Sequence, residues 1–392
     1  MKRVAFAIII IAFLGNCKEK YVSPAITSPT GYLVVEGVIN AGTGTTNIVL
    51  KRTTQLDSTA IVFERGAKVF VEGENNTQFN LLESGAGNYS VQGLNLNNSI
   101  KYRLHINTSD GKIYQSDFVT VQSTPPIDSV SWQQDSLGVH LFINTHDPTN
   151  KTKYYQWDYT ETWEYHSPYI TYFKLLPYNT SQGIRYAVVR TDMVMVSYDT
   201  TIIKCWQSDI SNKILIGSTV SLSENKIYLP INNIVTGSVK LGVLYSINTR
   251  QYSVSESKYL FLQKMKKNTE STGSVFDAQP SELNGNIHCI TNPNETVIGY
   301  IDICKIQETR IFINNDQLPY WNYVPPCMQF QIPNTPDSNT YAHNLGLVPT
   351  TIADMGIPGP DPFGKPGKYY FTTPECLDCT LTGTNVKPIF WR

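Results

Sequence analysis

The chain has 392 residues and a formal net charge of −1, with 41% hydrophobic and 16% charged residues. Its 31 Lys and Arg residues nearly equal its 32 Asp and Glu residues and form no basic block, so the charge pattern that binds a nucleic-acid backbone is missing. The hydrophobic content argues against disorder, and few charges with 24 Tyr do not suit a helical bundle. Composition therefore predicts an exported, β-rich globular protein of two or three domains with no nucleic-acid partner.

The N-terminus has the form of a lipoprotein signal peptide, which we assign to residues 1–16. Lys2 and Arg3 precede an apolar run, Val4–Leu14, that is too short to span a membrane as a mature helix. Leu14-Gly15-Asn16-Cys17 resembles the bacterial lipobox, although asparagine replaces the usual Gly or Ala at its third position. This resemblance implies lipidation at Cys17; the alternative is a plain signal peptide in which the cysteine is incidental.

The residues after the lipobox favour the outer membrane. Lys18-Glu19-Lys20 resembles, in part, the surface-export signal of Bacteroidota lipoproteins. We therefore expect a protein held at the outer membrane through a lipid anchor, on its surface-exposed or its periplasmic face. Residues 17–30 are predicted to form a tether.

Strand-like runs separated by turn residues follow at intervals of roughly ten residues, a spacing that is typical of a β-sandwich. Thr124-Pro125-Pro126 ends the series, because paired prolines cannot continue a central strand. We predict an Ig-like β-sandwich over residues 31–123. Its expected strands are Tyr32–Ile39, Ile48–Arg52, Ala67–Glu72, Phe79–Glu83, Tyr89–Leu94, Tyr102–Asn107 and Ile113–Val121.

A second β-rich domain, ending in a helix, is predicted over residues 124–268. Residues 155–166 alternate with period two, as a strand does. Ser253-Val254-Ser255-Glu256 has the form of a capping box and predicts a helix up to about Asn268. The other expected strands are Ala187–Val196, Ile202–Trp206, Lys226–Pro230 and Val239–Ile247.

One face of the strand over residues 155–166 is aromatic, and it is the candidate ligand-binding surface. Aromatic side chains can stack on planar or sugar ligands while nearby polar groups fix the orientation. The candidate residues are Trp157, Trp163, Tyr165 and Tyr169, the last of which lies in the loop Ser167–Thr171. The alternative is that this face forms the sandwich core.

The last region, residues 269–392, is predicted to be Cys-rich and loop-rich, with a hairpin of Asn286–Ile290 and Val297–Ile303. Six cysteines remain after Cys17, and disulfides are the default state in an exported chain. We expect Cys376 and Cys379 to pair with each other or with Cys205 and Cys327. A separate cross-strand pair is expected between Cys289 and Cys304.

No metal or cofactor site and no catalytic motif is predicted. The sequence has no His-Glu-x-x-His, Gly-x-Ser-x-Gly, phosphate-loop or dinucleotide-binding pattern. Asp158 with Glu161, or His146 with Asp147, could be drawn as acid/base pairs, as glycoside hydrolysis requires. A chain with 32 acidic residues supplies such pairs by chance, so we do not expect an enzyme.

Several stretches together resemble the Bacteroidota lipoprotein family called domain of unknown function 4249. They are the lipobox, Gly31–Asn40, Thr124–Val130, Cys205-Trp206, Phe276–Pro280 leading to Gly285–Ile287, Cys327, Glu375–Cys379 and Asn385–Trp391. The resemblance covers essentially the whole mature chain and implies no catalytic residues. Members often look like products of genes beside those of TonB-dependent outer-membrane receptors, which implies an accessory role in uptake or envelope assembly.

The expected protein is an outer-membrane lipoprotein of tandem β-sandwiches with one helix and a disulfide-braced, loop-rich C-terminal region. Its expected role is non-enzymatic: it binds a ligand or assists a TonB-dependent barrel as an accessory component. The alternatives are a structural or adhesive surface protein and, less favoured, a hydrolase. The sequence leaves the ligand, partner, membrane leaflet and oligomeric state undetermined.

Overall fold

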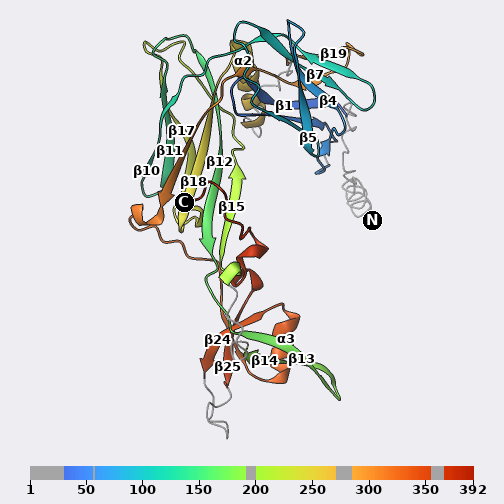
Figure 1. Cartoon of the computed structure of the whole chain (residues 1–392). Coiled ribbons are helices and arrows are strands. Elements are labelled where there is room, and N and C mark those ends of the chain that lie inside the picture. Colours follow the sequence, from blue (N-terminus) through green and yellow to red (C-terminus); the bar gives the residue numbers. More distant parts are fainter. Residues whose placement is uncertain (1–30, 56–57, 191–199, 271–284, 355–365) are drawn as a thin grey trace, which may run out of the picture.

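The computed structural model describes residues 31–55, 58–190, 200–270, 285–354 and 366–392. They form two β-sandwiches that lie side by side, and a smaller lobe that projects beyond the far end of the second sandwich (Figure 1). We call these parts the N-terminal sandwich, the second sandwich and the distal lobe. This architecture confirms the predicted fold class. The predicted signal peptide, the lipidation site Cys17 and the tether lie outside the described residues.

The N-terminal sandwich contains all seven predicted strands, although the one expected over Ile113–Val121 is divided in two and the short strand at Val62–Phe63 was not predicted. Period two turns every second side chain of these strands to the core. In β7, for example, Tyr102, Leu104 and Ile106 are buried while the residues between them are not. Its consecutive strands are β1 (Leu33–Asn40), β2 (Thr45–Arg52), β3 (Val62–Phe63), β4 (Lys68–Gly73), β5 (Gln78–Gly85), β6 (Asn88–Gln92), β7 (Lys101–Asn107), β8 (Ile113–Ser116) and β9 (Val119–Thr120).

Three short strands from the C-terminal third complete this sandwich. β19 (Ile287–Cys289) pairs with β8, while β20 (Val297–Gly299) and β21 (Ile303–Cys304) run parallel to β1. A parallel pair needs a crossover connection, and here the crossover includes every strand of the second sandwich that lies between β10 and β18 in the chain. The predicted hairpin is therefore wrong, because β19 and β20 pair with other strands. The predicted region 269–392 is likewise divided among all three parts of the molecule.

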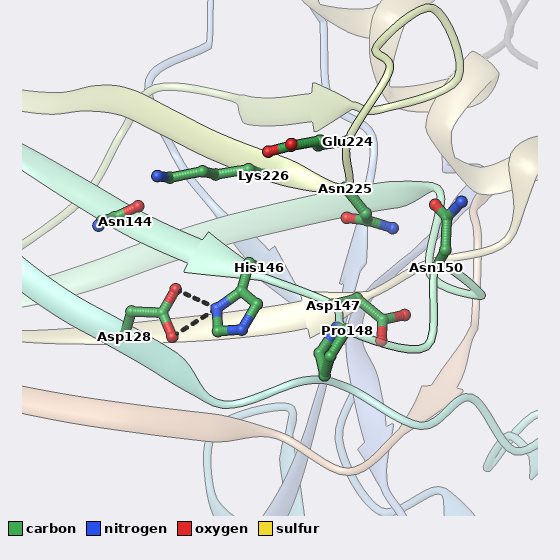
Figure 2. A pocket seen from close by; sticks show the side chains of 9 residues that line it. All are labelled: Asp128, Asn144, His146, Asp147, Pro148, Asn150, Glu224, Asn225 and Lys226. Carbon is green, nitrogen blue, oxygen red and sulfur yellow. Dashed lines mark hydrogen bonds and ion pairs between the residues drawn. The ribbon is translucent and has the colours of Figure 1, made fainter.

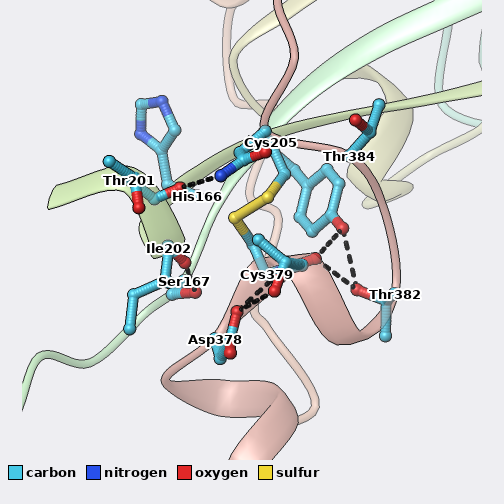
Figure 3. Close-up of a disulfide and its surroundings, with 12 residues drawn as sticks. His166, Ser167, Thr201, Ile202, Cys205, Asp378, Cys379, Thr382 and Thr384 are labelled. Atoms are coloured by element: carbon cyan, nitrogen blue, oxygen red, sulfur yellow. Dashed lines mark hydrogen bonds between the residues drawn. A yellow bond between two sulfur atoms is a disulfide. The ribbon is translucent and has the colours of Figure 1, made fainter. Parts of the chain in front are cut away.

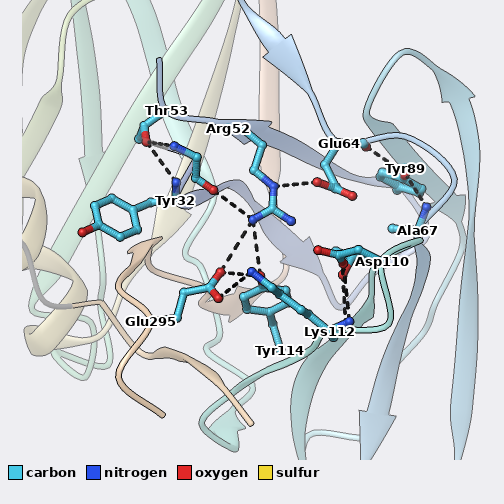
Figure 4. Close-up of polar contacts among 12 residues, drawn as sticks. Tyr32, Arg52, Thr53, Glu64, Ala67, Tyr89, Asp110, Lys112, Tyr114 and Glu295 are labelled. Atoms are coloured by element: carbon cyan, nitrogen blue, oxygen red, sulfur yellow. Dashed lines mark hydrogen bonds and ion pairs between the residues drawn. The ribbon is translucent and has the colours of Figure 1, made fainter. Parts of the chain in front are cut away.

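A polar network holds the returning segment against the N-terminal sandwich (Figure 4). Glu295 accepts hydrogen bonds from the Tyr114 hydroxyl at 2.6 Å and from Lys112 Nζ at 2.8 Å. Arg52 lies 3.7 Å from the same carboxylate and donates to Glu64 at 2.6 Å. Burial raises the pKa of Glu295, but the bonds from Lys112 and Tyr114 outweigh it and leave that pKa below its usual value.

The second sandwich packs two sheets over an aromatic and aliphatic core. β12 is its longest strand, and its odd-numbered residues point inward. One sheet contains β10 (Ile127–Gln134), β11 (Gly138–His146) and β17 (Lys226–Val235). The other contains β15 (Lys204–Ile210), β12 (Tyr154–His166), β18 (Leu244–Ser253) and β22 (Gln307–Asn314), with β16 (Leu215–Ser218) also paired to β12.

Three of the strands predicted within residues 124–268 need correction. The one expected over Ile202–Trp206 is β15, which begins at Lys204, because Thr200–Ile202 form a short 3-10 helix, η2. The strand expected over Val239–Ile247 begins late, since Val239–Leu241 form a short 3-10 helix, η3, before β18. The strand expected over Ala187–Val196 is β14 (Gly183–Arg190), and residues 191–196 lie outside the described residues.

Helix α2 (Glu256–Glu270) lies between the two sandwiches (Figure 1). It confirms the predicted helix. The capping residue, however, is Ser255 and not Ser253, because Ser255 Oγ accepts a hydrogen bond from the Lys258 backbone N–H at 3.2 Å. The helix buries Phe261 and Leu262. Among the described helices, none is long and apolar enough to cross a membrane.

Two separate segments of the chain form the distal lobe. Its elements are the hairpin of β13 (Phe173–Thr180) and β14, the sheet of β23 (Phe330–Pro333), β25 (Lys368–Thr372) and β24 (Val348–Asp354), and helix α3 (Pro336–Asn344). Its small core includes Phe173, Tyr369 and Phe371. Helix α3 was not predicted. It begins after Thr335, whose side chain accepts from the Ser338 backbone N–H.

Candidate binding site between the sandwiches

The aromatic face predicted to bind a ligand is mostly core. Trp157 and Trp163 are 1% and 7% exposed and belong to the cluster that fills the second sandwich. The indole N–H of Trp157 donates to buried Gln251 at 2.8 Å. The ring of Trp163 is covered by Lys240, whose Nζ lies 4.8 Å from the ring centroid. The predicted binding role of these two residues is therefore wrong, and the alternative, a sandwich core, describes them correctly.

Tyr165 and Tyr169 are half-buried and hold the C-terminal segment in place. The Tyr165 hydroxyl donates to the Cys379 carbonyl at 2.8 Å and lies 2.8 Å from Thr382 Oγ1. The Tyr169 hydroxyl donates to the Cys327 carbonyl at 3.2 Å. Both side chains thus brace the disulfide-bonded region.

The structure resolves the cysteine alternatives. Cys205 is bonded to Cys379 (Figure 3), and Cys327 is bonded to Cys376, which confirms the pairing with the two distant cysteines. The predicted Cys289–Cys304 bond is wrong, and both thiols are free and buried. The reason is topological: Cys289 lies on β19 beside β8, whereas Cys304 lies on β21 beside β1.

The acid/base pairs considered from the sequence are not formed. Asp158 and Glu161 are three positions apart on β12, so their side chains leave opposite faces of the strand. Glu161 is buried and accepts from the Tyr245 hydroxyl at 2.8 Å, with Lys240 also in contact. His146 points to Asp128, with Nδ1 2.7 Å from the nearer carboxylate oxygen, and not to Asp147 (Figure 2).

The hollow around His146 has a volume of about 570 Å³ and is lined mainly by polar residues (Figure 2). Most of these residues already have protein partners. Asp147 accepts from the backbone N–H groups of Thr149 and Thr152 at 2.9 and 2.7 Å, and these bonds outweigh burial and lower its pKa. Asn225 accepts from the Tyr155 hydroxyl at 2.8 Å. Within the described residues, no three His, Cys, Asp or Glu side chains converge as metal ligands would.

A second cavity, of about 590 Å³, lies where both sandwiches meet α2, and we call it the inter-sandwich cavity. Its walls come from four parts of the chain that are far apart in sequence. They are β1 and β2, the polar face of β12 with β18, helix α2, and the segment from β20 to Ile306. A concave site with apolar walls and a few polar groups, placed between domains, is the usual form of a small-molecule site.

The polar wall of the inter-sandwich cavity is formed by facing residues of β12 and β18. Asp158 lies opposite Arg250, and Gln156 lies opposite Tyr252. Arg250 Nε is 2.6 Å from Asp158 Oδ1, and the Tyr252 hydroxyl donates to Oδ2 at 2.8 Å. Burial raises the pKa of Tyr252, and the nearby Asp158 carboxylate raises it further. The hydroxyl is therefore a proton donor at neutral pH.

The apolar wall is the inner face of α2 and the segment that returns through β20. Phe261 and Leu262 are buried, and Met265 and Ile298 are half-buried. The rings of Phe261 and Tyr300 lie 5.7 Å apart between centroids. The cavity therefore presents an apolar surface opposite a charged one.

The sequence predicted the helix and the strands of this cavity but not the cavity. The alternation in β12 drew attention to the aromatic side, whereas the polar side, with Gln156 and Asp158, lines the site. The one local signal was Lys258, a charged residue at a helix position that the spacing of Phe261 and Leu262 marks as inward-facing.

Fold and site together define a mainly β, two-sandwich protein with a disulfide-braced distal lobe and an amphipathic cavity between its sandwiches. The chain belongs to the family described as domain of unknown function (DUF4249), whose model matches residues 19–310. Among solved structures, a two fibronectin type-III domain segment from chicken tenascin is similar at 11% identity, over 58% of this chain and 94% of that chain, with a TM-score of 0.17. No curated protein matches the sequence.

Proposed function

We propose that this chain is a Bacteroidota outer-membrane lipoprotein that binds a small ligand in the inter-sandwich cavity. In this proposal it acts without catalysing a reaction, as an accessory component of a TonB-dependent receptor in uptake or envelope assembly. The observation that carries the proposal is the cavity of about 590 Å³, which has one charged and one apolar wall. That volume is within the range of about 300–1,000 Å³ typical of small-molecule sites.

The order of segments along the chain supports binding at the membrane. About 16 residues separate Cys17 from Leu33, where β1 begins, and a fully extended chain of that length spans at most about 55 Å. β1 itself lines the inter-sandwich cavity. A lipid on Cys17 would therefore keep the cavity within reach of a receptor in the same membrane.

The distal lobe supplies a surface for that receptor. Leu176 and Tyr178 on β13 and Val189 on β14 share one face of the hairpin and are 37–40% exposed. The hairpin projects away from both sandwiches (Figure 1). Apolar side chains gathered on one exposed face are a common feature of protein contact sites. We therefore assign the receptor contact to this face of β13 and β14.

The ligand part of the proposal is tested by native mass spectrometry of the protein isolated from its own membranes. Asn47 is exposed on β2 and lines the cavity, so Asn47→Trp should fill the site. Asn80 is also a solvent-exposed asparagine. It lies on β5 and does not line the cavity, so Asn80→Trp is the control. We expect a small-molecule adduct on the wild type and on Asn80→Trp, and none on Asn47→Trp. No adduct on any of the three would contradict a binding role.

The anchor and the receptor contact have separate tests. Cys17→Ala should move the protein from the membrane to the soluble fraction, and retention in the membrane would contradict lipidation at that residue. In a pull-down from solubilised membranes, the wild type should recover a barrel receptor and Leu176→Asp should recover less. Asn179→Asp adds the same charge at an exposed position on the same strand and should behave as the wild type. Recovery of no barrel receptor would favour a structural or adhesive role.

A further inference from the structure

One charged side chain that lines the inter-sandwich cavity has no ion-pair partner among the residues that the structure describes. Lys258, in the first turn of α2, is 4% exposed and lines the cavity. Burial is the largest influence on the pKa of its ammonium group, and no hydrogen bond or ion pair from a described residue is among the influences that follow. Its countercharges are Asp302 and Asp158, which attract it only through space. Burying a charge without a direct partner costs free energy of folding, and a bound ligand of opposite charge would offset that cost.

The other charges at the cavity are already matched. Asp158 is bound by Arg250, and Glu36 is bound by Lys51 at 2.7 Å. Asp302, which does not line the cavity, is fully buried; its Oδ2 accepts from the Ser255 backbone N–H at 2.7 Å, and its Oδ1 accepts no hydrogen bond from the described residues. Burial lowers the pKa of Lys258 and raises the pKa of Asp302, which biases both groups toward their neutral forms. An anion bound beside Lys258 would favour the charged ammonium form.

A second polar group of the cavity also lacks a partner. Gln156 Oε1 is buried and accepts no hydrogen bond from the described residues. Gln156 lines the same cavity, on the strand face that carries Asp158. A buried carbonyl oxygen without a donor is uncommon in folded proteins. The site therefore offers a cation and an acceptor opposite an apolar wall.

We infer that the inter-sandwich cavity binds a small amphipathic carboxylate, whose anionic group pairs with Lys258 and whose apolar part packs on Phe261, Met265 and Ile298. This inference rests on the proposed binding function and gives its ligand class. A single negative charge fits because Lys258 is the one unmatched cation among the described residues that line the cavity, and the nearby Asp158 carboxylate disfavours a doubly charged group. The carboxylate could belong to a fatty acid or to the C-terminus of an apolar peptide.

The test measures binding of dodecanoate and of acetyl-Leu-Leu to the full-length protein by calorimetry, with dodecanol as the neutral probe. Lys258→Met replaces the unpaired charge by an apolar chain of similar length. Lys264→Met makes the same change at an exposed position of α2. We expect Lys258→Met to weaken binding of the carboxylate by about 10- to 100-fold, as loss of a charge-assisted hydrogen bond does, and to leave dodecanol binding unchanged. Lys264→Met should leave all affinities unchanged.

Which carboxylate binds more tightly distinguishes a lipid source from a peptide source, and either result supports the inference. Equal carboxylate affinity in Lys258→Met and wild type would overturn it, as would failure of both carboxylates to bind. If Lys258→Met does not fold, Met265→Glu should repel the carboxylates and retain dodecanol. A native adduct that Asn47→Trp removes, together with no carboxylate binding, would overturn the ligand class and leave the binding function standing.

Discussion

Removing the Cys205–Cys379 disulfide should destabilise the second sandwich more than its small change in side-chain volume would suggest. The bond joins residues that are 174 positions apart in sequence. The Cys327–Cys376 bond lies within this segment and shortens the loop by 49 residues. The loop that the first bond closes is therefore about 125 residues. The chain-entropy model assigns such a loop about 5 kcal/mol, and measured losses of native disulfides are about 2–5 kcal/mol. We expect the double variant Cys205→Ala/Cys379→Ala to lose about 3–5 kcal/mol.

Guanidinium unfolding followed by tryptophan fluorescence measures this loss locally. Trp206 on β15 and Trp391 at the C-terminus lie 6.3 Å apart between ring centroids, beside the disulfide. With a denaturant slope of about 4 kcal/mol/M, the midpoint should fall by about 1 M. Cys289→Ala is the matched control, because it removes a buried thiol without a crosslink and should cost about 1 kcal/mol. A double variant that unfolds at the midpoint of this control would refute the bracing role of the bond.

Three further predictions concern buried groups. Glu161→Ala should cost about 3–5 kcal/mol in chemical denaturation, because it leaves the Tyr245 hydroxyl and a lysine without their buried partner; a loss under about 1 kcal/mol would refute this. The pKa of Glu295 is lower in the folded protein than its unfolded value of about 4.3, so its network stabilises the fold above that pH and loses this effect as the pH falls through the folded pKa. The difference in melting temperature between wild type and Glu295→Gln should therefore become smaller below about pH 4.3. A difference that grows there would contradict the assignment. In a thiol titration, Cys289 and Cys304 should react only after denaturation, since burial raises the pKa of Cys304 to about 12; rapid reaction of the native protein would contradict their burial.

Local pattern was sufficient to predict most strands, because alternation reports directly on which side chains face a core. It could not tell which face of β12 borders a cavity. The face with Trp157 and Trp163 packs inside, and the face with Gln156 and Asp158 borders the cavity. An amphipathic strand between two domains has two buried faces, and sequence alone does not say which of them borders a cavity.

The parts that sequence could not predict are those made by distant segments. β20 and β21 join β1 from more than 250 residues away, and the cavity forms only when they and α2 are in place. The spacing of cysteines likewise left the pairing open, and only the fold brings Cys205 to Cys379. Helix α3 did have a local signal, because Thr335-Pro336-Asp337 places a capping residue, a first-turn proline and an acid in order.

The most direct test of the account is a crystal structure of the protein purified from its native outer membrane without denaturation. We predict density for a bound small molecule in the inter-sandwich cavity, with an acidic group within hydrogen-bonding distance of Lys258 Nζ and an apolar part against α2. A cavity that holds only ordered water, or a ligand bound elsewhere on the protein, would contradict the account.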